Sequence, residues 1–530
     1  MNVRGEQTVR PFGRAFVGAP TGSESADFDR HAIQELGVPQ ETLMENAGRS
    51  AALVLQRLLP RGQVTAFVGS GNNGGDALVL LRNLAAWGRP VTAILVGERD
   101  EDETLLHGWG IRTFLDSDFQ DSESLLDGEL AGADVLVDGV LGTGISGAPR
   151  ERQARVIQAM NRADAPVLSL DIPSGVDADT GAVPGDAVRA VVTVTFGGVK
   201  LGALLHPGRA LVGRLVAVEI GFPPVEEDSF KGALITPGWV RRRLPKRDPD
   251  THKNAVGALL LVAGHSGMAG AAVLAARAAL RAGVGFLRVA SPGANREILQ
   301  TAVPEAVFVD ATDQVALSEA VEASRALGVG PGLGTGEEGA GILRRILAPG
   351  GRQPVLLDAD ALNLLSGGEG PDLRALGETR DLILTPHPGE MGRLTGRDTA
   401  EVTRNRSGAA LDLAAEKACT VLLKGMPSLV ASPGGRILVD TVGSSDLAAA
   451  GMGDVLSGVI SAFLAQGSGS MEAAALGLFT SGRAAARKAL GVSLTPEDVI
   501  EALPEALREE GEGETDLDYP FVLFDQDPAR

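Results

Sequence analysis

Short apolar segments alternate along the chain with longer amphipathic stretches rich in Ala and Leu. In the first half, the apolar segments are rich in Val, Ile and Leu and predict strands at Val64–Val68, Val91–Val96, Val135–Val137, Val167–Leu170, Val191–Phe196 and Leu215–Ile220. The stretches between them, such as Asp76–Trp87 and Gln153–Ala163, predict helices. Strands and helices that alternate in this way are typical of a parallel sheet with helices on both faces.

The same alternation begins again in the second half of the chain. Strands are predicted at Gly257–Ala263, Gly285–Ala290, Ala326–Val329, Val355–Asp358, Leu382–Thr385, Thr420–Leu423 and Ser428–Ala431, and helices at Met268–Ala282, Ala448–Ala465, Met471–Leu490 and Pro496–Leu507. The pattern breaks between Phe222 and Asp250, where two prolines lead into acidic Glu226–Asp228 and then into basic Arg241–Arg247. We therefore predict two α/β domains, over residues 1–228 and 229–510, and an acidic tail over residues 511–530.

The composition supports folded domains and limits the possible partners. A chain of 530 residues is too long for one ordinary core, and its aromatic content of 4% means that Ala, Val, Leu and Ile must fill the cores. A net charge of −20 repels phosphate backbones and anionic membranes, so we expect neither nucleic acid nor a membrane as a partner. Small anionic ligands would have to be held by backbone N–H groups and helix N-termini.

The cysteine and histidine content and the N-terminal segment bear on the cellular compartment and on metal binding. The single Cys419 allows no intramolecular disulfide and no cysteine-based zinc site, and the six histidines are scattered. Met1–Gly22 lacks the apolar segment of a signal peptide, and no apolar stretch approaches the roughly 18 residues of a membrane-spanning helix. These features predict a cytoplasmic protein without a transition-metal site.

Three strand ends in the first half carry turns rich in Gly, Asn and Asp: Gly69–Asp76, Val137–Gly144 and Leu170–Asp177. Glycines allow close backbone approach, and a helix N-terminus offers unpaired N–H groups to phosphate. Each turn alone is also compatible with a tight connection that binds nothing. Because ligands bind at the carboxyl edge of such sheets, three turns together predict a pocket whose oxygen atoms suit a hard cation.

The sequences GSGNNGGDALV, VDGVLGTG and LDIPSGVDADTG, preceded by Leu43–Gly48, resemble the N-terminal domain of the bifunctional NAD(P)H-hydrate repair enzymes over about residues 25–222. The resemblance implies a Rossmann-like three-layer sandwich with NAD(P)H-hydrate epimerase activity and a bound potassium ion. It implies that substrate is held by Asn72, Asn73, Gly74, Gly75, Asp76, Gly142, Thr143, Gly144, Ile145, Ser146, Gly147, Ala148 and Asp171, and potassium by Asn73, Asp138 and Ser174. Asp171 would be the acid/base, although an Asp there is also a common helix-capping or turn residue. Ala77 stands where the family pattern has glycine.

In the second half, Gly451–Asp454 precedes a long apolar helix, where two glycines and the helix dipole favour an anion. Asp454 could accept a proton from a hydroxyl that attacks a phosphoryl group. Further strand-end segments are Val329–Gly334, Leu384–Glu390 and Leu423–Ser428, and all of them could line one cleft. The plain alternatives are a helix cap for Gly451–Asp454 and a solvated side chain for Lys424. His387 could have a structural role, but for this residue we favour a functional one.

These segments resemble the ribokinase-like NAD(P)H-hydrate dehydratase domain of the same family over about residues 231–510. The resemblance implies that the hydrate contacts Ala271, Gly332, His387 and Asp454, with Asp454 as the base, and that the nucleotide contacts Lys424, Gly425, Met426, Pro427, Ser428 and Gly453. It implies phosphorylation of the ring hydroxyl by ADP or ATP with Mg²⁺, followed by loss of phosphate. The chain departs from the family pattern at Ala448–Ala450, where Ser and Lys are frequent.

The leading hypothesis is an epimerase fused to a dehydratase that together repair the hydrates of NADH and NADPH, in a protein that we expect to be a homo-oligomer. One alternative is a kinase of another small alcohol, which leaves the first site unexplained. The other is an N-terminal domain that has lost catalysis and binds protein or RNA. That alternative predicts the loss of Asn73, Asp138 or Asp171, and all three are present.

Overall fold

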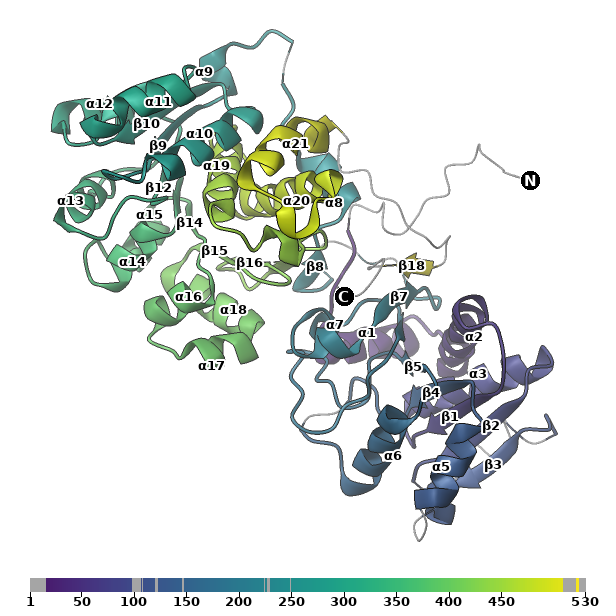
Figure 1. The fold of residues 1–530 in the computed structure, drawn as a ribbon. Coiled ribbons are helices and arrows are strands. Elements are labelled where there is room, and N and C mark those ends of the chain that lie inside the picture. The colour runs from purple at the N-terminus through teal and green to yellow at the C-terminus, as the bar shows by residue number, and fades with distance from the viewer. Residues whose placement is uncertain are drawn as a thin grey trace. The chain divides into compact units, whose positions relative to one another are not determined.

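The structure is a computed structural model, and it describes residues 16–97, 106, 108–119, 123–144, 147–223, 225, 229–247, 249–508 and 521–523. The chain divides into two compact units. The N-terminal unit comprises residues 1–233 and 514–530, and the C-terminal unit comprises residues 234–513 (Figure 1). Each unit is built around one sheet, in agreement with the two α/β domains expected from the sequence.

The N-terminal sheet has the strand order β18-β7-β6-β5-β4-β1-β2-β3. Its strands are β1 (Val64–Val68), β2 (Val91–Leu95), β3 (Arg112–Leu115), β4 (Val135–Gly139), β5 (Val167–Leu170), β6 (Val192–Phe196), β7 (Arg214–Val218) and β18 (Phe521–Leu523). Strands β1 to β7 are parallel, and β18, from the segment predicted as an acidic tail, pairs antiparallel with β7.

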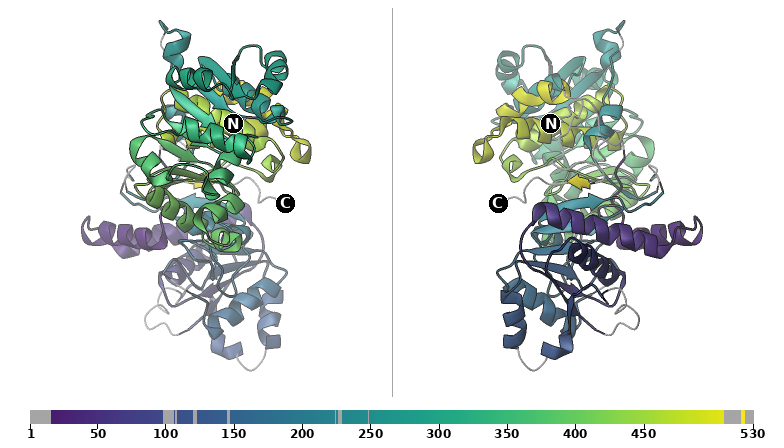
Figure 2. Two further views of the ribbon diagram at one scale, coloured as in Figure 1. Left: turned by 90° about the vertical axis from the view of Figure 1, so that its left-hand side faces the viewer. Right: turned by 90° about the vertical axis from the view of Figure 1, so that its right-hand side faces the viewer.

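The helices of this unit are α1 (Gly22–Gln34), α2 (Gln40–Leu58), α3 (Asn72–Ala86), α5 (Glu123–Ala131), α6 (Glu151–Arg162) and α7 (Leu201–Leu204). Successive residues of β1 face opposite sides of the sheet, as the period of two requires. Val64 and Val68 belong to a core cluster with residues of α2 and α3, whereas Phe67 belongs to a second cluster with residues of α5 and α6. The result is a three-layer sandwich (Figures 1 and 2).

The C-terminal sheet has the order β11-β10-β9-β12-β13-β14-β15-β16-β17-β8. Its strands are β8 (Gly232–Leu234), β9 (Ala258–Val262), β10 (Phe286–Ser291), β11 (Val307–Asp310), β12 (Ala326–Val329), β13 (Val355–Leu357), β14 (Leu382–Leu384), β15 (Thr420–Leu423), β16 (Leu429–Ala431) and β17 (Ile437–Val439). The strands from β11 to β15 are parallel, and β16 and β17 add antiparallel pairs.

The helices of the C-terminal unit are α8 (Pro237–Arg243), α9 (Lys253–Val256), α10 (Ala269–Arg281), α11 (Arg296–Ala302), α12 (Gln314–Glu322), α13 (Glu337–Ile346), α14 (Asp360–Ser366), α15 (Leu373–Thr379), α16 (Pro388–Thr395), α17 (Thr399–Arg404), α18 (Arg406–Lys417), α19 (Met452–Ala465), α20 (Ser470–Lys488) and α21 (Pro496–Arg508). Helices α12 to α15 and α18 share one core cluster, and α10, α19, α20 and α21 pack together as a second layer. Small residues permit this packing: a Cβ on Gly458 of α19 would lie 2.2 Å from the Ala275 carbonyl oxygen of α10.

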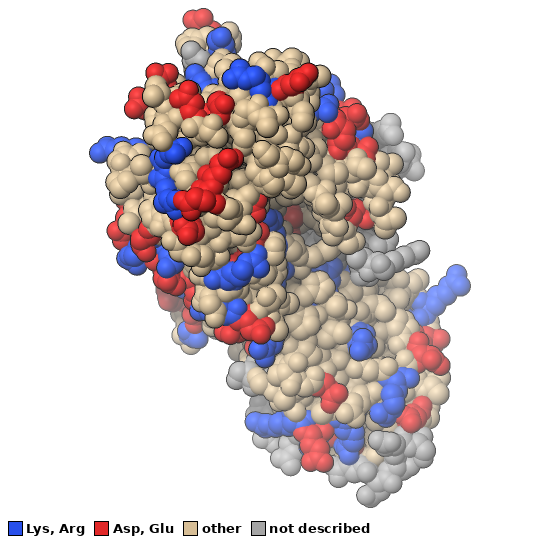
Figure 3. Space-filling model, turned by 60° about the vertical axis from the view of Figure 1, so that its left-hand side comes forward, with Lys and Arg blue, Asp and Glu red and all other residues tan. Residues whose placement is uncertain are grey.

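The helix predicted from Ala448 begins at Met452, because Gly451 adopts a left-handed backbone with a φ of 88° that ends the preceding turn. Among the described residues, no helix has the length and apolar content needed to cross a membrane. On the face shown in Figure 3, acidic and basic side chains of the described residues are interspersed.

Candidate active sites

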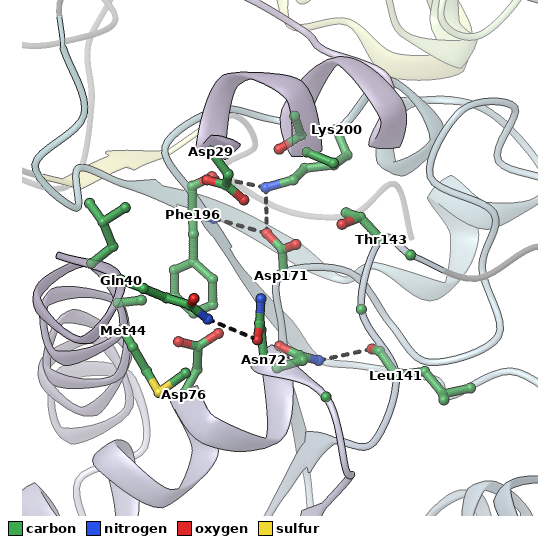
Figure 4. Close-up of a pocket in the computed structure, with 18 of the residues that line it drawn as sticks. Asp29, Gln40, Met44, Asn72, Asp76, Leu141, Thr143, Asp171, Phe196 and Lys200 are labelled. Atoms are coloured by element: carbon green, nitrogen blue, oxygen red, sulfur yellow. Dashed lines mark hydrogen bonds and ion pairs between the residues drawn. The ribbon is translucent and has the colours of Figure 1, made fainter. Parts of the chain in front are cut away.

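A cavity of about 920 Å³ opens at the carboxyl ends of the N-terminal strands (Figure 4). Its volume lies within the range of pockets that hold small ligands and cofactors. Eight of the residues predicted to hold substrate line it: Asn72, Asn73, Asp76, Gly142, Thr143, Gly144, Ala148 and Asp171. Gly74, Gly75 and Gly147 are not among the lining residues, and Ile145 and Ser146 lie outside the described residues.

Asn73, in the first turn of α3, links the three strand-end turns. Its amide Nδ2 donates to the Leu141 carbonyl at 2.8 Å and to the Leu170 carbonyl at 3.1 Å. Its Oδ1 is buried and accepts no hydrogen bond from any described residue. A buried acceptor without a partner costs free energy, so this oxygen is suited to a ligand or a cation.

Asp138 is the buried centre of the second turn. Its carboxylate accepts hydrogen bonds from the Ser174 amide at 2.8 Å and hydroxyl at 2.5 Å, and from the Ser169 hydroxyl at 2.8 Å. Burial raises the pKa of Asp138, although these hydrogen bonds oppose the rise. Ser174 also accepts a bond from the Leu141 amide at 2.9 Å. The structure therefore brings together Asn73, Asp138 and Ser174, the three residues predicted to hold potassium.

Asp171 follows β5 with a φ of 62°, a backbone conformation that is uncommon for residues other than glycine. Its Oδ1 accepts bonds from the Lys200 ammonium at 2.5 Å, the Phe196 amide at 3.2 Å and the Thr195 hydroxyl at 3.3 Å. These donors come from β6 and from Lys200, so the carboxylate caps no helix, and its Oδ2 accepts no bond from the described residues. The side chain of Lys200 is only 2% exposed.

Sequence reasoning did not find Lys200, nor Asp29 on α1, yet both line the cavity beside Asp171 (Figure 4). Burial raises the pKa of Asp29 to about 6, with Lys200 opposing the rise and Asp171 adding to it. Gln40, Met44 and Phe196 also line the cavity without having been predicted. Of these residues, Met44 lies in the segment Leu43–Gly48 that carries part of the resemblance, and the others lie in none of the glycine-rich motifs.

In the C-terminal unit, the ends of β13, β14 and β15 meet the beginning of α19. The Lys424 ammonium lies 2.7 Å from the Asp358 Oδ1 and 3.9 Å from the Glu390 Oε2. The Ser457 hydroxyl of α19 donates to the Asp358 Oδ2 at 2.6 Å. A Cβ on Gly453 would lie 3.8 Å from the Lys424 ammonium. Lys424 and Gly453, both predicted to contact nucleotide, are thus neighbours around the buried carboxylate of Asp358.

Asp454, in the first turn of α19, has its pKa raised to about 6 by burial and by the nearby charge of Asp358, while Lys424 opposes the rise. Burial alone would lower the pKa of Lys424, but the attraction of Asp358 and Glu390 outweighs it and raises that pKa. Asp454 is therefore still largely ionised at neutral pH but is a stronger base than an ordinary Asp, which suits proton transfer near pH 7.

Three of the residues predicted to contact the hydrate lie on different elements: Gly332 follows β12, Ala271 is on α10 and His387 follows β14. A Cβ on Gly332, whose φ is 57°, would lie 2.9 Å from the Cβ of Ala271, so these two residues adjoin. His387 is the N-cap of α16: its Nδ1 accepts a bond from the Gly389 amide at 3.0 Å, and its Nε2 lies 3.5 Å from the Glu390 Oε1. The structure thus gives His387 a structural role, while half of its side chain is exposed.

The backbone of the segment Lys424–Ser428 accepts hydrogen bonds from a buried residue that sequence reasoning did not find. Arg406 is buried and donates to the carbonyls of Met426 at 3.0 Å and Lys424 at 3.3 Å. Burial lowers the pKa of Arg406 to about 10, and no carboxylate among the described residues pairs with it. A Cβ on Gly425 would lie 2.5 Å from the Arg406 guanidinium, which explains the glycine.

Comparison with known proteins follows the division into two units. One family profile, described as NAD(P)H-hydrate dehydratase, matches residues 259–505, and another, described as YjeF-related protein N-terminus, matches residues 40–202. The bifunctional NAD(P)H-hydrate repair enzyme Nnr of Moorella thermoacetica is 37% identical to the chain, covering 92% of this chain and 96% of the relative. The chain belongs to the family of bifunctional NAD(P)H-hydrate repair enzymes.

A second bifunctional repair enzyme and one solved structure are also similar to this chain. The protein of that name from Thermofilum pendens is 38% identical, covering 92% of this chain and 95% of the relative. Among solved structures, the ADP/ATP-dependent NAD(P)H-hydrate dehydratase of Bacillus subtilis, co-crystallised with ATP and Mg²⁺, is 29% identical with a TM-score of 0.47. It covers 52% of this chain and 98% of that chain.

Proposed function

We propose that this chain repairs the hydrates of NADH and NADPH in two reactions. The N-terminal unit interconverts the R and S hydrates. The C-terminal unit dehydrates the S hydrate at the expense of ADP or ATP and gives NAD(P)H, AMP or ADP, and phosphate. The observation that carries the proposal is that one chain holds two acidic side chains at strand-end sites: Asp171, bonded to Lys200 beside a cavity, and Asp454, in the first turn of α19.

The hydrate carries a hydroxyl on the ring carbon beside the ring nitrogen, and the two epimers differ at that carbon. Epimerisation therefore requires proton transfer at this hydroxyl. Asp171 suits the task because Lys200 and the backbone of Phe196 hold its Oδ1 and leave Oδ2 towards the cavity. The amides at the start of α3 would receive the anionic diphosphate of the substrate.

Potassium is part of this proposal for the N-terminal site, and Asn73, Asp138 and Ser174 would hold it. The three residues lie at neighbouring strand ends of one sheet edge. Their side chains offer oxygen atoms, including the unpartnered Oδ1 of Asn73, which suit a hard cation. A bound cation there would contribute positive charge for the anionic part of the substrate. The protein residues position that charge at the same edge from which Asp171 projects.

In the C-terminal unit, Asp454 would take the proton of the ring hydroxyl as that oxygen attacks the terminal phosphoryl group of the nucleotide. The Gly453 amide in the first turn of α19 and the Lys424 ammonium would stabilise the charge that develops on the phosphoryl oxygens. Mg²⁺ commonly uses one or two carboxylates together with phosphates, and Glu390, close to Lys424, would supply one of them. Loss of the phosphate from the ring, together with a proton from the neighbouring ring carbon, then forms the ring double bond and restores the reduced cofactor.

The direct test adds purified protein to a mixture of the R and S hydrates. With ADP or ATP, we expect full recovery of reduced-nicotinamide absorbance and release of one phosphate for each cofactor regained. Without nucleotide, we expect the protein to interconvert the epimers, as chromatography would show, and to recover no absorbance. Equal recovery with and without nucleotide would contradict the phosphoryl-transfer mechanism.

Replacement of Arg406 tests the support of the nucleotide segment. Arg406→Met removes the donors to Met426 and Lys424, so we expect the KM for nucleotide to rise about tenfold, in keeping with the loss of one or two hydrogen bonds. The kcat should change much less, because Asp454 is untouched. Arg404→Met, an exposed neighbour, is the matched control. A lower kcat at unchanged KM would contradict the assigned role.

A further inference from the structure

Helix α1 is fixed over the N-terminal cavity by contacts at several points. Its N-terminus carries a capping box between Thr21 and Glu24, and the Gly22 amide donates to the Asp179 Oδ1 at 2.6 Å. Farther along, the ring of Phe28 packs edge-on against Phe222, with centroids 5.3 Å apart. The next residue in the helix is therefore held in a defined position.

That next residue is Asp29, whose half-buried side chain lines the same cavity as Asp171 and Lys200. Asp29 comes from the helix and Asp171 from the edge of the sheet, so the two carboxyl groups belong to different walls of the cavity (Figure 4). The other charged groups that line it are Arg30, Asp76 and Arg150. Lys200 bonds to Asp171 and not to Asp29.

The two carboxyl groups have different surroundings. Asp171 accepts a hydrogen bond from the Lys200 ammonium and two further bonds, from the Phe196 amide and the Thr195 hydroxyl. Asp29 is bonded to no cation among the described residues, and burial raises its pKa to about 6. Two carboxyl groups that share one cavity but differ in surroundings can divide the roles of acid and base.

We propose that Asp29 is a second catalytic residue of the epimerase site and acts there as the acid, with Asp171 as the base. This inference rests on the proposed epimerase function. Asp29 gives its proton to the hydroxyl oxygen of the hydrate, and the C–O bond breaks as the lone pair of the ring nitrogen forms a C=N bond. Water then adds to the opposite face of that carbon, and its proton passes to Asp171. Exchange of protons with cavity water restores the starting state.

The pH dependence distinguishes this role from a merely structural one. The reaction needs Asp29 protonated, so kcat/KM for epimerisation should fall about tenfold for each pH unit above about 6. Asp29→Asn keeps the size of the side chain and removes the acid, so we expect kcat/KM at pH 6 to fall about 10²-fold and the decline above pH 6 to disappear. Asp29→Glu should restore part of the rate together with that decline.

The experiment follows the ratio of the epimers by chromatography, without nucleotide, in full-length protein between pH 5 and 9, with the spontaneous rate subtracted. Glu35→Gln, an exposed acidic residue at the end of the same helix that pairs with His31 away from the cavity lining, is the control and should behave as wild type. A lower rate in Asp29→Asn with an unchanged pH profile, or no change in rate, would overturn the assignment. A wild-type protein that leaves the epimer ratio unchanged would instead contradict the proposed epimerase function and this inference with it.

Discussion

Asp171→Asn should slow epimerisation by about 10²–10⁴-fold, because Asn has nearly the same shape but cannot take a proton. Dehydration of the S hydrate should continue at its normal rate, since Asp454 lies in the other unit. A mixture of epimers supplied with nucleotide should then give a two-phase trace. The S hydrate is consumed rapidly, and the R hydrate only as fast as it epimerises spontaneously.

The measurement is a time course of absorbance on each purified epimer, with the epimer ratio read by chromatography. Asp164→Asn, an exposed Asp of the same unit, is the control for the loss of one charge. Because Asp171 is the partner of buried Lys200, the circular dichroism and melting temperature of the variant must be checked. If the folded variant converts the R hydrate at the wild-type rate, Asp171 is not the base.

The alternation of apolar and amphipathic segments was sufficient to predict the parallel strands of both sheets except β3 and β11. It failed at these two because neither has a buried face: three of the four positions of β3 are exposed, and the four positions of β11 are exposed or half-buried. It also missed β8 and β17, which have three residues each. Strand signals at β3 and β11 depend on burial more than on intrinsic preference.

The same reasoning explains which site residues could be predicted. Asn73, Asp138 and Ser174 lie in turns rich in glycine, where the need for close backbone approach leaves a visible pattern. Asp29 and Lys200 lie in no such turn: Asp29 is on the amphipathic helix α1, and Lys200 is in a short segment after β6. Both reach the cavity only through tertiary packing. Asp358 was nearer to detection, since it is a buried Asp that ends a predicted strand.

His387 shows the opposite difficulty. A histidine between two prolines suggested function, and the structure gives its Nδ1 a capping role that proline at the first helical position favours. Rigid placement and function are not exclusive, because half of the His387 side chain is exposed. The sequence alone could not show that Nδ1 is the nitrogen that caps the helix. That assignment depends on where the backbone places the Gly389 amide.

Asp454→Asn should have the opposite effect to Asp171→Asn. The variant should regenerate reduced cofactor about 10²–10⁴-fold more slowly, because the ring hydroxyl loses its base, while it interconverts the epimers at the normal rate. In the wild type, dehydration should rise as the pH increases through about 6, because Asp454 must be ionised and its pKa is raised to that value. This ascending limb should disappear in the variant.

The two Asp variants together decide whether the chain holds two sites or one. Asp381→Asn, an exposed Asp before β14, controls for charge in the C-terminal unit and should leave both reactions unchanged. Independent failure is expected because Asp171 and Asp454 belong to separate sheets, each with its own strand-end turns. Mixing the two variants should then restore repair of both hydrates, since the hydrate diffuses between molecules. If each folded variant loses both reactions, a single shared active site must replace the present assignment.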